Sequence, residues 1–209
     1  MTKKKRTWIF TLLALLIAAF HISPFYIMIN MSLKTLSPAL HPHFENYVTA
    51  MEHGNLMSAM WNTFQITALS VIIIVVAGAM AAYPLARKAS RKNQIILTFI
   101  VGVMMVPQLS ILVPLYKEMV TLKGINKLWG IVIVSATFHL PMAIYMYSNF
   151  IRSIPKELDE AAMIDGCSRM QAFFQVILPC LKSTTVSVII LNGVGIWNDY
   201  QFQLYFLQK

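Results

Sequence analysis

Five long segments of this 209-residue chain carry almost no charged residue, and they restrict its fold more than any other feature. Each is longer than the roughly 20 residues that a helix needs to cross the hydrocarbon core of a bilayer. Backbone groups in lipid find no water to bond, so such a run must form a helix, whose hydrogen bonds are internal. The sequence therefore predicts an all-α integral membrane protein with a single transmembrane domain over residues 1–209. The five predicted spans are approximately 8–31, 61–86, 94–116, 128–150 and 183–207.

The overall composition agrees with a membrane protein. Hydrophobic residues make up 57% of the chain and charged residues 12%, whereas a typical soluble domain has about 25% charged residues. The formal net charge of +9 does not indicate a nucleic-acid partner, because Lys and Arg stand at the ends of the apolar runs instead of forming one basic face. The first run follows a basic N-terminus but is too long for the core of a signal peptide, and no small-residue cleavage site follows it. We therefore expect it to be retained as a membrane anchor.

The distribution of positive charge predicts the orientation. Twelve of the 17 Lys and Arg residues lie on the side that holds the N-terminus and the loop 152–182, and five lie on the other side. Because basic residues concentrate in cytoplasmic loops, the N-terminus and this loop are expected in the cytoplasm. The segment 35–59 is expected outside, where apolar residues at helical spacing predict a short interfacial helix.

The loop 152–182 has the signals of two short helices. Acidic side chains fill the first turns of the first helix, as the helix dipole favours. Gly166 is placed to end that helix in a left-handed cap. Ser168, with Gln171 three residues later, predicts a capping box at the start of the second helix. Pro179 is expected to end the second helix, so the loop is predicted to be a helical hairpin between the fourth and fifth spans.

One face of the first short helix is narrow and carries mostly small side chains. Leu158, Ala161, Ala162 and Asp165 have the i, i+3, i+4, i+7 spacing that places them together. Small side chains allow close approach by another surface, so a coupling element seated in the groove of a partner is one interpretation. A solvated amphipathic connector is the other.

The segment from Glu160 to Pro179 resembles the EAA signature of ABC-importer permeases. Glu160-Ala161-Ala162 precedes Gly166 at the spacing of the signature, and Val176 stands where the usual pattern has Ile, just before Leu178-Pro179. Other blocks along nearly the whole chain resemble the carbohydrate-uptake branch of that family, the maltose-system type. They are Ser32-Leu33-Lys34, Phe44–Tyr47, Trp61-Asn62-Thr63, Ala82–Arg87, Val113–Tyr116, Ser153–Leu158 and Trp197–Tyr200.

This resemblance implies the permease subunit of an ATP-driven, binding-protein-dependent sugar importer, a multi-pass protein of the bacterial or archaeal cell membrane. Such permeases pair with a second, usually different, permease, two ATPase subunits bind below, and an external solute-binding protein delivers the sugar. Closure of the ATPase pair would drive alternating access through the loop 152–182. By resemblance, the residues in contact with the ATPase would be Glu160, Ala161, Ala162, Asp165, Gly166, Leu178 and Pro179. A bulky residue such as Trp at position 166 is expected to uncouple ATP hydrolysis from uptake.

No catalytic or metal-binding motif appears in the sequence. The G-x-x-x-x-G-K-[ST] phosphate loop is missing, so ATP and Mg²⁺ are expected on the ATPase subunits, and this chain is expected to be neither an enzyme nor a cofactor-binding protein. Cys167 and Cys180 form no C-x-x-C pair and have no His nearby, so we expect small packing residues and no metal site.

The last predicted span holds the candidates for the substrate pathway. Asp199 is the only acidic residue within a predicted span, and ionisable residues in a membrane are functional candidates. Amides and carboxylates bond sugar hydroxyls, and aromatic rings stack on sugar C–H surfaces. The candidate set is Asn192, Trp197, Asn198, Asp199 and Tyr200. The alternative role is hydrogen bonding between helices, which polar membrane residues often provide.

Family members normally have six spans and a cytoplasmic C-terminus, whereas this sequence stops at Lys209 after the fifth predicted run. The resemblance therefore implies five of six helices and a C-terminal truncation. A non-transporting membrane scaffold is an alternative function if truncation inactivates the chain. A proton-coupled secondary transporter is another alternative, but Asp199, His21 and His139 are too scattered for a proton relay.

Overall fold

The computed structural model describes residues 3–34 and 44–208, and every regular element in those ranges is a helix. This confirms the all-α prediction for the described part of the chain. The chain forms two compact units, residues 1–59 and residues 60–209.

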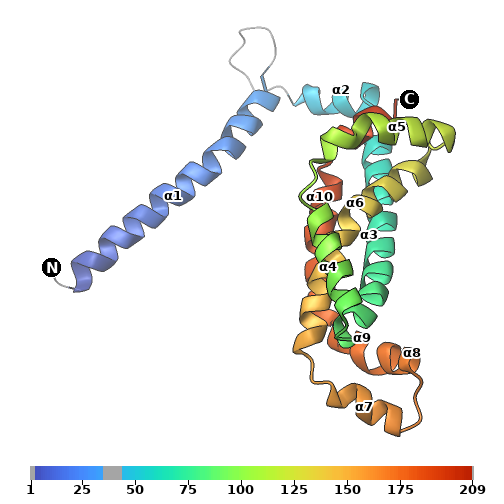
Figure 1. The fold of residues 1–209 in the computed structure, drawn as a ribbon. Coiled ribbons are helices and arrows are strands. Elements are labelled where there is room, and N and C mark those ends of the chain that lie inside the picture. The colour runs from blue at the N-terminus through green and yellow to red at the C-terminus, as the bar shows by residue number, and fades with distance from the viewer. Residues whose placement is uncertain (1–2, 35–43, 209) are drawn as a thin grey trace. The chain divides into compact units, whose positions relative to one another are not determined.

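The first unit contains the long helix α1 (Lys3–Ser32), drawn in blue in Figure 1. Its stretch Trp8–Ser32 is apolar and long enough to cross a membrane, and its most apolar window buries no residue within the structure. A helix that is apolar all round needs lipid or another protein around it.

The first unit also contains the short helix predicted within 35–59, observed as α2 (Glu45–His53). The Asn46 side chain donates to the carbonyl oxygens of Ser32 and Lys34, at 3.0 and 3.2 Å, and so ties the start of α2 to the end of α1. Residues 35–43 of the predicted external segment lie outside the described residues.

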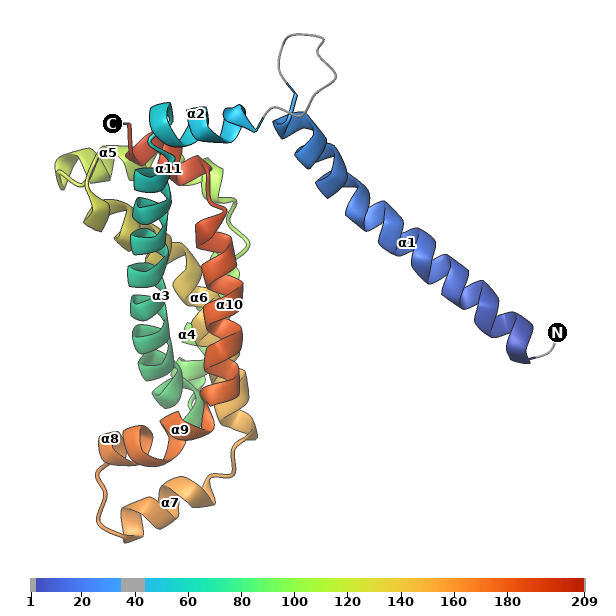
Figure 2. The same ribbon diagram turned by 180° about the vertical axis from the view of Figure 1, so that it is seen from behind.

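The second unit begins within α3 and consists of long helices with a hairpin of short ones. Figures 1 and 2 show α3, α4, α6 and α10 running alongside one another, with α5 and α11 at one end and α7, α8 and α9 at the other. The elements are α3 (Leu56–Arg87), α4 (Arg91–Val103), η1 (Gln108–Ile111), α5 (Leu112–Thr121), α6 (Leu128–Ser153), α7 (Glu157–Ile164), α8 (Arg169–Ala172), η2 (Phe173–Ile177), α9 (Leu178–Cys180), α10 (Lys182–Trp197) and α11 (Gln201–Phe206).

The helix α6 forms the centre of this unit. It contacts α4, α10 and α11, and many of its side chains are buried. The helix α3 approaches α6 closely at Gly78, where an added Cβ would lie 3.1 Å from the Cβ of Ala143. Ser70 of α3 donates to the carbonyl oxygen of Val132 in α6 at 3.2 Å. A small residue and a hydrogen bond are the usual means of holding membrane helices together, because lipid supplies no hydrophobic driving force between them.

The predicted third span, 94–116, is not one helix. It consists of α4 and the pair η1–α5, whose directions differ by 91°, with Pro107 in the break between them. Proline lacks an N–H and disfavours a helical conformation in the residue before it, so a long apolar run is not sufficient for a continuous helix here.

The predicted fifth span, 183–207, is also interrupted. The helix α10 ends at Trp197, and α11 starts after a short break that contains Asp199. At the other end, Pro179 does not end the second hairpin helix as expected. It lies in the last turn of the continuous helical stretch Arg169–Cys180, and the bend of 74° before α10 comes after Cys180.

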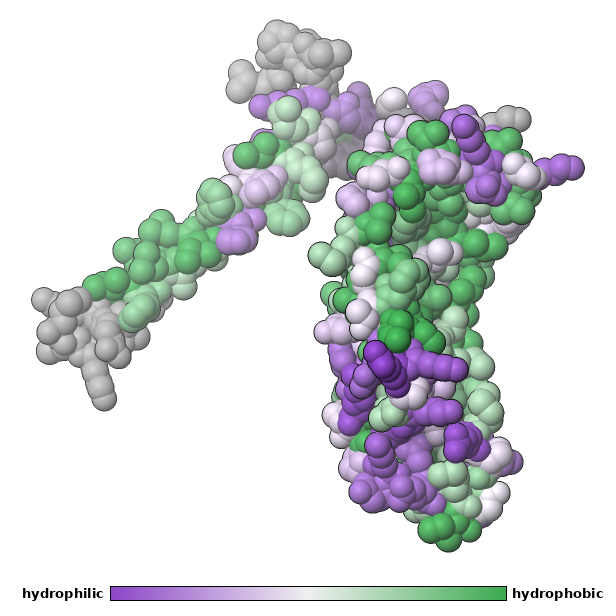
Figure 3. Space-filling view, viewed as in Figure 1, coloured by the Kyte–Doolittle hydropathy of each residue, from purple (hydrophilic) through white to green (hydrophobic). Residues whose placement is uncertain are grey.

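Three described helices are therefore long and apolar enough to cross a membrane, and up to five spans result if each bent pair forms one. The prediction of five spans is met only in that second case. Figure 3 shows hydrophobic residues over the long helices of the second unit and hydrophilic residues at both of its ends, including the end where α7 and α8 lie.

Candidate functional site

The hairpin of α7, α8, η2 and α9 contains most of the residues that the EAA resemblance singles out. The helix α7 ends at Ile164, and Gly166 has the left-handed φ of +89° that the sequence predicts. The Gly166 N–H donates to the carbonyl oxygen of Met163 (3.1 Å), and the Cys167 N–H donates to that of Ala162 (2.9 Å). These are the two hydrogen bonds of a Schellman cap, so the sharp turn at the end of α7 is built by glycine.

The second helix of the hairpin starts with the predicted capping box. The Gln171 N–H donates to the Ser168 hydroxyl at 3.3 Å, and the Ser168 N–H donates to the Gln171 side chain at 2.8 Å. The helix then widens into the π-turn η2, where buried Phe173 packs on the ring of Tyr83 with ring centroids 5.0 Å apart. Local capping residues therefore shape the hairpin, and an aromatic contact seats it against α3.

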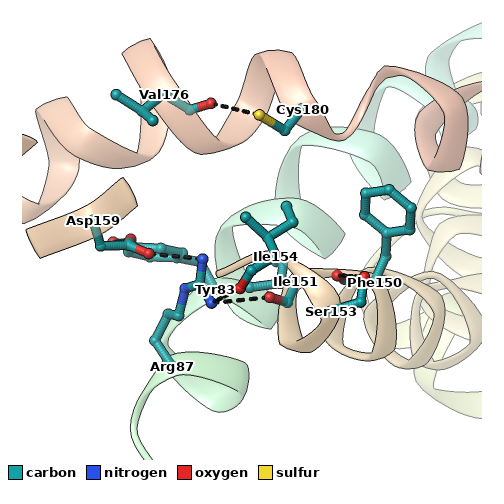
Figure 4. Close-up of polar contacts among 9 residues, drawn as sticks. All are labelled: Tyr83, Arg87, Phe150, Ile151, Ser153, Ile154, Asp159, Val176 and Cys180. Atoms are coloured by element: carbon teal, nitrogen blue, oxygen red, sulfur yellow. Dashed lines mark hydrogen bonds and ion pairs between the residues drawn. The ribbon is translucent and has the colours of Figure 1, made fainter. Parts of the chain in front are cut away.

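A buried ion pair fastens the hairpin to two long helices (Figure 4). The Arg87 Nη2 lies 2.7 Å from Asp159 Oδ2, and 12% and 9% of these side-chain surfaces are exposed. The Tyr83 hydroxyl donates to the other Asp159 oxygen at 2.6 Å. Arg87 Nη1 also donates to the carbonyl oxygens of Ile151 and Ile154, at 3.0 and 2.7 Å.

This network, called here the Arg87 clamp and consisting of Tyr83, Arg87 and Asp159, joins three elements. Arg87 is the last residue of α3, its carbonyl acceptors stand at the end of α6, and Asp159 lies in the first turn of α7. Arginine has a planar fork of donors that can serve a carboxylate and carbonyls together, and a cation is favourable at a helix C-terminus. The helix α7 is therefore bonded directly to the ends of α3 and α6.

The sequence did not point to the Arg87 clamp. In the sequence, Arg87 is one of several basic residues at the ends of apolar runs, and Asp159 is one of several acids in the first turns of a short helix. The resemblance contained a signal, because Ala82–Arg87 and Ser153–Leu158 are both blocks of the family and end within one residue of clamp members. The sequence did not show that these blocks meet.

The expected ATPase-contact residues divide into two groups. Glu160, Ala161, Asp165, Gly166 and Pro179 are exposed. Ala162 is only 7% exposed and Leu178 is partly buried against the core, so within this chain they pack inward and do not form the outer surface.

The outer surface of the hairpin also includes Ile164, which is not among the residues of the helical face predicted from the sequence. Ile164, the last residue of α7, is 85% exposed. A protruding apolar residue beside exposed small residues is typical of a surface that enters a pocket of a partner.

The candidate pathway residues do not form one cluster. Asn192 is 2% exposed, and its Oδ1 lies 3.3 Å from His139 Nδ1 on α6. This is the inter-helix hydrogen bond that was the alternative interpretation. Asp199 accepts a hydrogen bond from the Phe202 N–H at 3.2 Å and so caps α11. Trp197, Asn198 and Tyr200 are exposed.

Asp199 instead lines a small pocket with other residues. The pocket has a volume of about 170 Å³, and Asp199 shares it with Gln108, Ser135 and His139. These four polar side chains come from η1, from α6 and from the break after α10. Among the five predicted pathway residues, only Asp199 lines this pocket.

Close packing beside the pocket leads to a stability prediction. A methyl group on Gly195 would lie 2.8 Å from His139 Cε1, so Gly195→Ala should force the imidazole or α10 to move. Overpacking of this kind costs about 1–3 kcal/mol, and the purified protein should unfold at a lower temperature. Gly193→Ala in the same helix is the matched control, because its nearest neighbour, a Val71 methyl group, would be 3.9 Å away. Equal unfolding temperatures for the two variants would contradict this packing.

The described residues contain no group of three or more His, Cys, Asp or Glu side chains that would hold a metal ion. Cys167 and Cys180 are both free thiols, the first partly exposed and the second exposed.

Comparison with known proteins identifies the family. The model of the family described as the binding-protein-dependent transport system inner membrane component matches residues 74–209. The chain belongs to this family. The permease is 39% identical to the melibiose/raffinose/stachyose import permease protein MelC of Bacillus subtilis, over 99% of this chain and 77% of that protein. It is 34% identical to the probable starch degradation products transport system permease protein AmyC of Thermoanaerobacterium thermosulfurigenes, over 92% of this chain and 73% of that protein.

The fold agrees with this assignment. The permease superposes with a TM-score of 0.81 on a chain in the crystal structure of a bacterial ABC transporter involved in the import of the acidic polysaccharide alginate. The match covers 100% of this chain and 77% of that chain, and the sequences are 20% identical. The permease is therefore the non-catalytic membrane subunit of a binding-protein-dependent ABC sugar importer in a prokaryotic cell membrane. This confirms the predicted family and function over a proton-coupled secondary transporter.

Proposed function

We propose that the hairpin 152–182 couples closure of the ATPase pair to movement of the membrane helices. The observation that carries this proposal is the Arg87 clamp, since it fastens α7 to the ends of α3 and α6. Force applied to α7 reaches two long helices through an ion pair and charge-assisted hydrogen bonds, which are shorter and stronger than neutral ones. The exposed side of α7 remains open for the ATPase.

The ATPase contact is proposed to centre on the tip of α7. Ile164 and Ala161 would supply the apolar contact, and Glu160 would bond a basic ATPase side chain, since within the described residues it forms no ion pair. Asp165 and Gly166 would border this contact. Ala162 and Leu178 would serve by holding the hairpin shape from inside, and Pro179 by its place in the last turn before the bend to α10.

The topology that fits this role has a cytoplasmic N-terminus and five spans, with α4 and η1–α5 counted as one bent span and α10 with α11 as the fifth. Basic residues at the ends of the apolar runs support that orientation, since they are enriched on the cytoplasmic side. In this arrangement the hairpin lies in the cytoplasm, where the ATPase subunits are, and α2 lies outside.

The importer is proposed to contain a second, different permease, two ATPase subunits that bind ATP and Mg²⁺, and an external solute-binding protein. Large apolar side chains on α3 and α10, such as Ile72, Ile190 and Val194, are more than half exposed, which suits a second permease or lipid beside them. The cargo is proposed to be a carbohydrate, the class named for both relatives above. Asp199 and the small polar pocket that it lines are proposed to border the path of the sugar hydroxyls.

Gly166 provides the test of the coupling role. A Cβ at this position meets no atom of the chain within 4 Å, so only the backbone φ of +89° disfavours Gly166→Ala. A left-handed alanine costs about 1–2 kcal/mol, which should loosen the Schellman turn and lower the sugar taken up per ATP hydrolysed in proteoliposomes. Gly166→Asn is the control, because asparagine tolerates this conformation.

Gly166→Trp then tests whether a partner lies close. It shares the backbone strain of Gly166→Ala and adds bulk where this chain itself has open space. Uptake well below that of Gly166→Ala, with ATP hydrolysis retained, is the expected result. Normal transport by the Trp variant would overturn the placement of the ATPase at this turn.

A further inference from the structure

A pocket with two different kinds of wall lies between the end of α3 and the hairpin. Its volume is about 550 Å³, and it is lined by the last two turns of α3, by α7, and by α8 with the start of η2. It shares Glu160 with the proposed ATPase contact and is distinct from the small pocket at Asp199. Neither the EAA resemblance nor the coupling role assigns it a ligand.

Cations gather along this pocket. Arg87, Lys88, Lys156 and Arg169 all line it. Arg87 is neutralised by Asp159, but the other three form no ion pair with any residue that the structure describes. The remaining acid of the lining is Glu160, so three free cations share the pocket with one free carboxylate. The pocket is therefore electrostatically complementary to an anion.

The other wall is apolar. Met80, Met163 and Met170 line it and are each about half exposed. Met80 precedes Arg87 by seven positions on α3, which places it about 10 Å further into the membrane-spanning helix. The pocket thus reaches from the cations at the helix end to Met80 at the level of the membrane, while Met163 and Met170 add an apolar lining from α7 and α8. Flexible methionines adapt to variable apolar chains.

We propose that this pocket binds an anionic phospholipid of the cytoplasmic leaflet, an inference that uses the cytoplasmic placement of the hairpin proposed above. The phosphate group contacts Lys88, Lys156 and Arg169, and the first part of an acyl chain lies along Met80. A soluble anion would fit less well, because it would leave the apolar methionine side of the pocket uncovered. A segment of the ATPase would also fit less well, because it would have to reach the level of the membrane to contact Met80. Anionic lipids of the cytoplasmic leaflet attract basic clusters beside membrane spans, and one lipid satisfies both walls.

The test uses the complete importer in nanodiscs of phosphatidylcholine with a minor fraction of phosphatidylglycerol. Lipids that stay bound after detergent extraction are counted by native mass spectrometry. We expect the wild-type importer to retain phosphatidylglycerol in preference to phosphatidylcholine. The variant K88Q/K156Q/R169Q should retain at least about tenfold less phosphatidylglycerol, because each cation near an anionic lipid strengthens its binding. All three side chains are exposed, so the variant is expected to fold and assemble.

The control variant R91Q/K92Q/K182Q removes the same charge from cytoplasmic positions that do not line the pocket. Its lipid retention should equal that of the wild type. The proposal is overturned if the wild type shows no preference for phosphatidylglycerol, if both variants lose lipid equally, or if glycerol 3-phosphate displaces the lipid as a free anion. It is also overturned if the pocket variant keeps its lipid and instead loses affinity for the ATPase. The Gly166 variants test the proposed coupling role separately, so the lipid proposal and the coupling proposal can each fail without the other.

Discussion

Replacing Asp159 by alanine is expected to be the most damaging single change at the hairpin. Arg87 would keep its two carbonyl acceptors but lose its carboxylate, and the Tyr83 hydroxyl would lose its acceptor. Removing one partner of a buried pair leaves an uncompensated charge and costs about 3 kcal/mol or more. Since every 1.4 kcal/mol is tenfold in an equilibrium, the seated form of α7 should become about a hundredfold less favoured. Proteoliposomes should then hydrolyse ATP with little sugar uptake, and the permease should unfold at a lower temperature.

Two further variants make this prediction specific to the Arg87 clamp. Tyr83→Phe removes one hydrogen bond and keeps the ion pair, so its cost should be about 1 kcal/mol. Arg87→Met combined with Asp159→Leu removes both charges, and buried ion pairs are often replaced by apolar pairs with little loss. The double variant should therefore be more stable than the sum of its single variants predicts, although the carbonyl oxygens of Ile151 and Ile154 lose a donor. Additive losses in this cycle would show that Arg87 and Asp159 do not act together.

The parts of the hairpin that the sequence predicted depend on close neighbours. A left-handed Gly166 and the capping box of Ser168 are decided by residues within about four positions, and both were confirmed. The Arg87 clamp depends on distant segments, since Tyr83 and Asp159 are 76 positions apart. One sequence contains no information on which of several acids meets which of several cations, so this contact required the structure.

The same distinction applies to the spans. Apolar length predicted the helical runs, because length and hydropathy are local properties. Pro107 lies in the break between α4 and η1, but no local pattern predicts that the directions of α4 and η1–α5 differ by 91°. Asp199 was placed within a span for the same reason. An apolar run that contains one acid predicts a continuous helix, whereas the helix is interrupted at Asp199 and the carboxylate caps α11.

Ile164 is expected to be the main apolar anchor of the ATPase contact. It was overlooked because it falls outside the face formed by Leu158, Ala161, Ala162 and Asp165. Ile164→Asp should weaken binding of the purified ATPase to the permease in nanodiscs by about 2 kcal/mol or more, roughly thirtyfold, as for other central interface residues. An aspartate would place a charge in the proposed apolar contact, and sugar uptake should fall with binding.

Ile164→Met is the matched control, because it keeps an apolar side chain of similar volume and should bind the ATPase nearly as well as the wild type. With 85% of its surface exposed, Ile164 contributes little to the fold of the permease, so neither variant should change the unfolding temperature. Asp159→Ala is expected to lower that temperature, and this difference separates a residue that touches the ATPase from one that holds α7 in place. If Ile164→Asp binds the ATPase normally, the contact does not lie at the tip of α7, and the docking surface must then be sought on the α8 side of the hairpin.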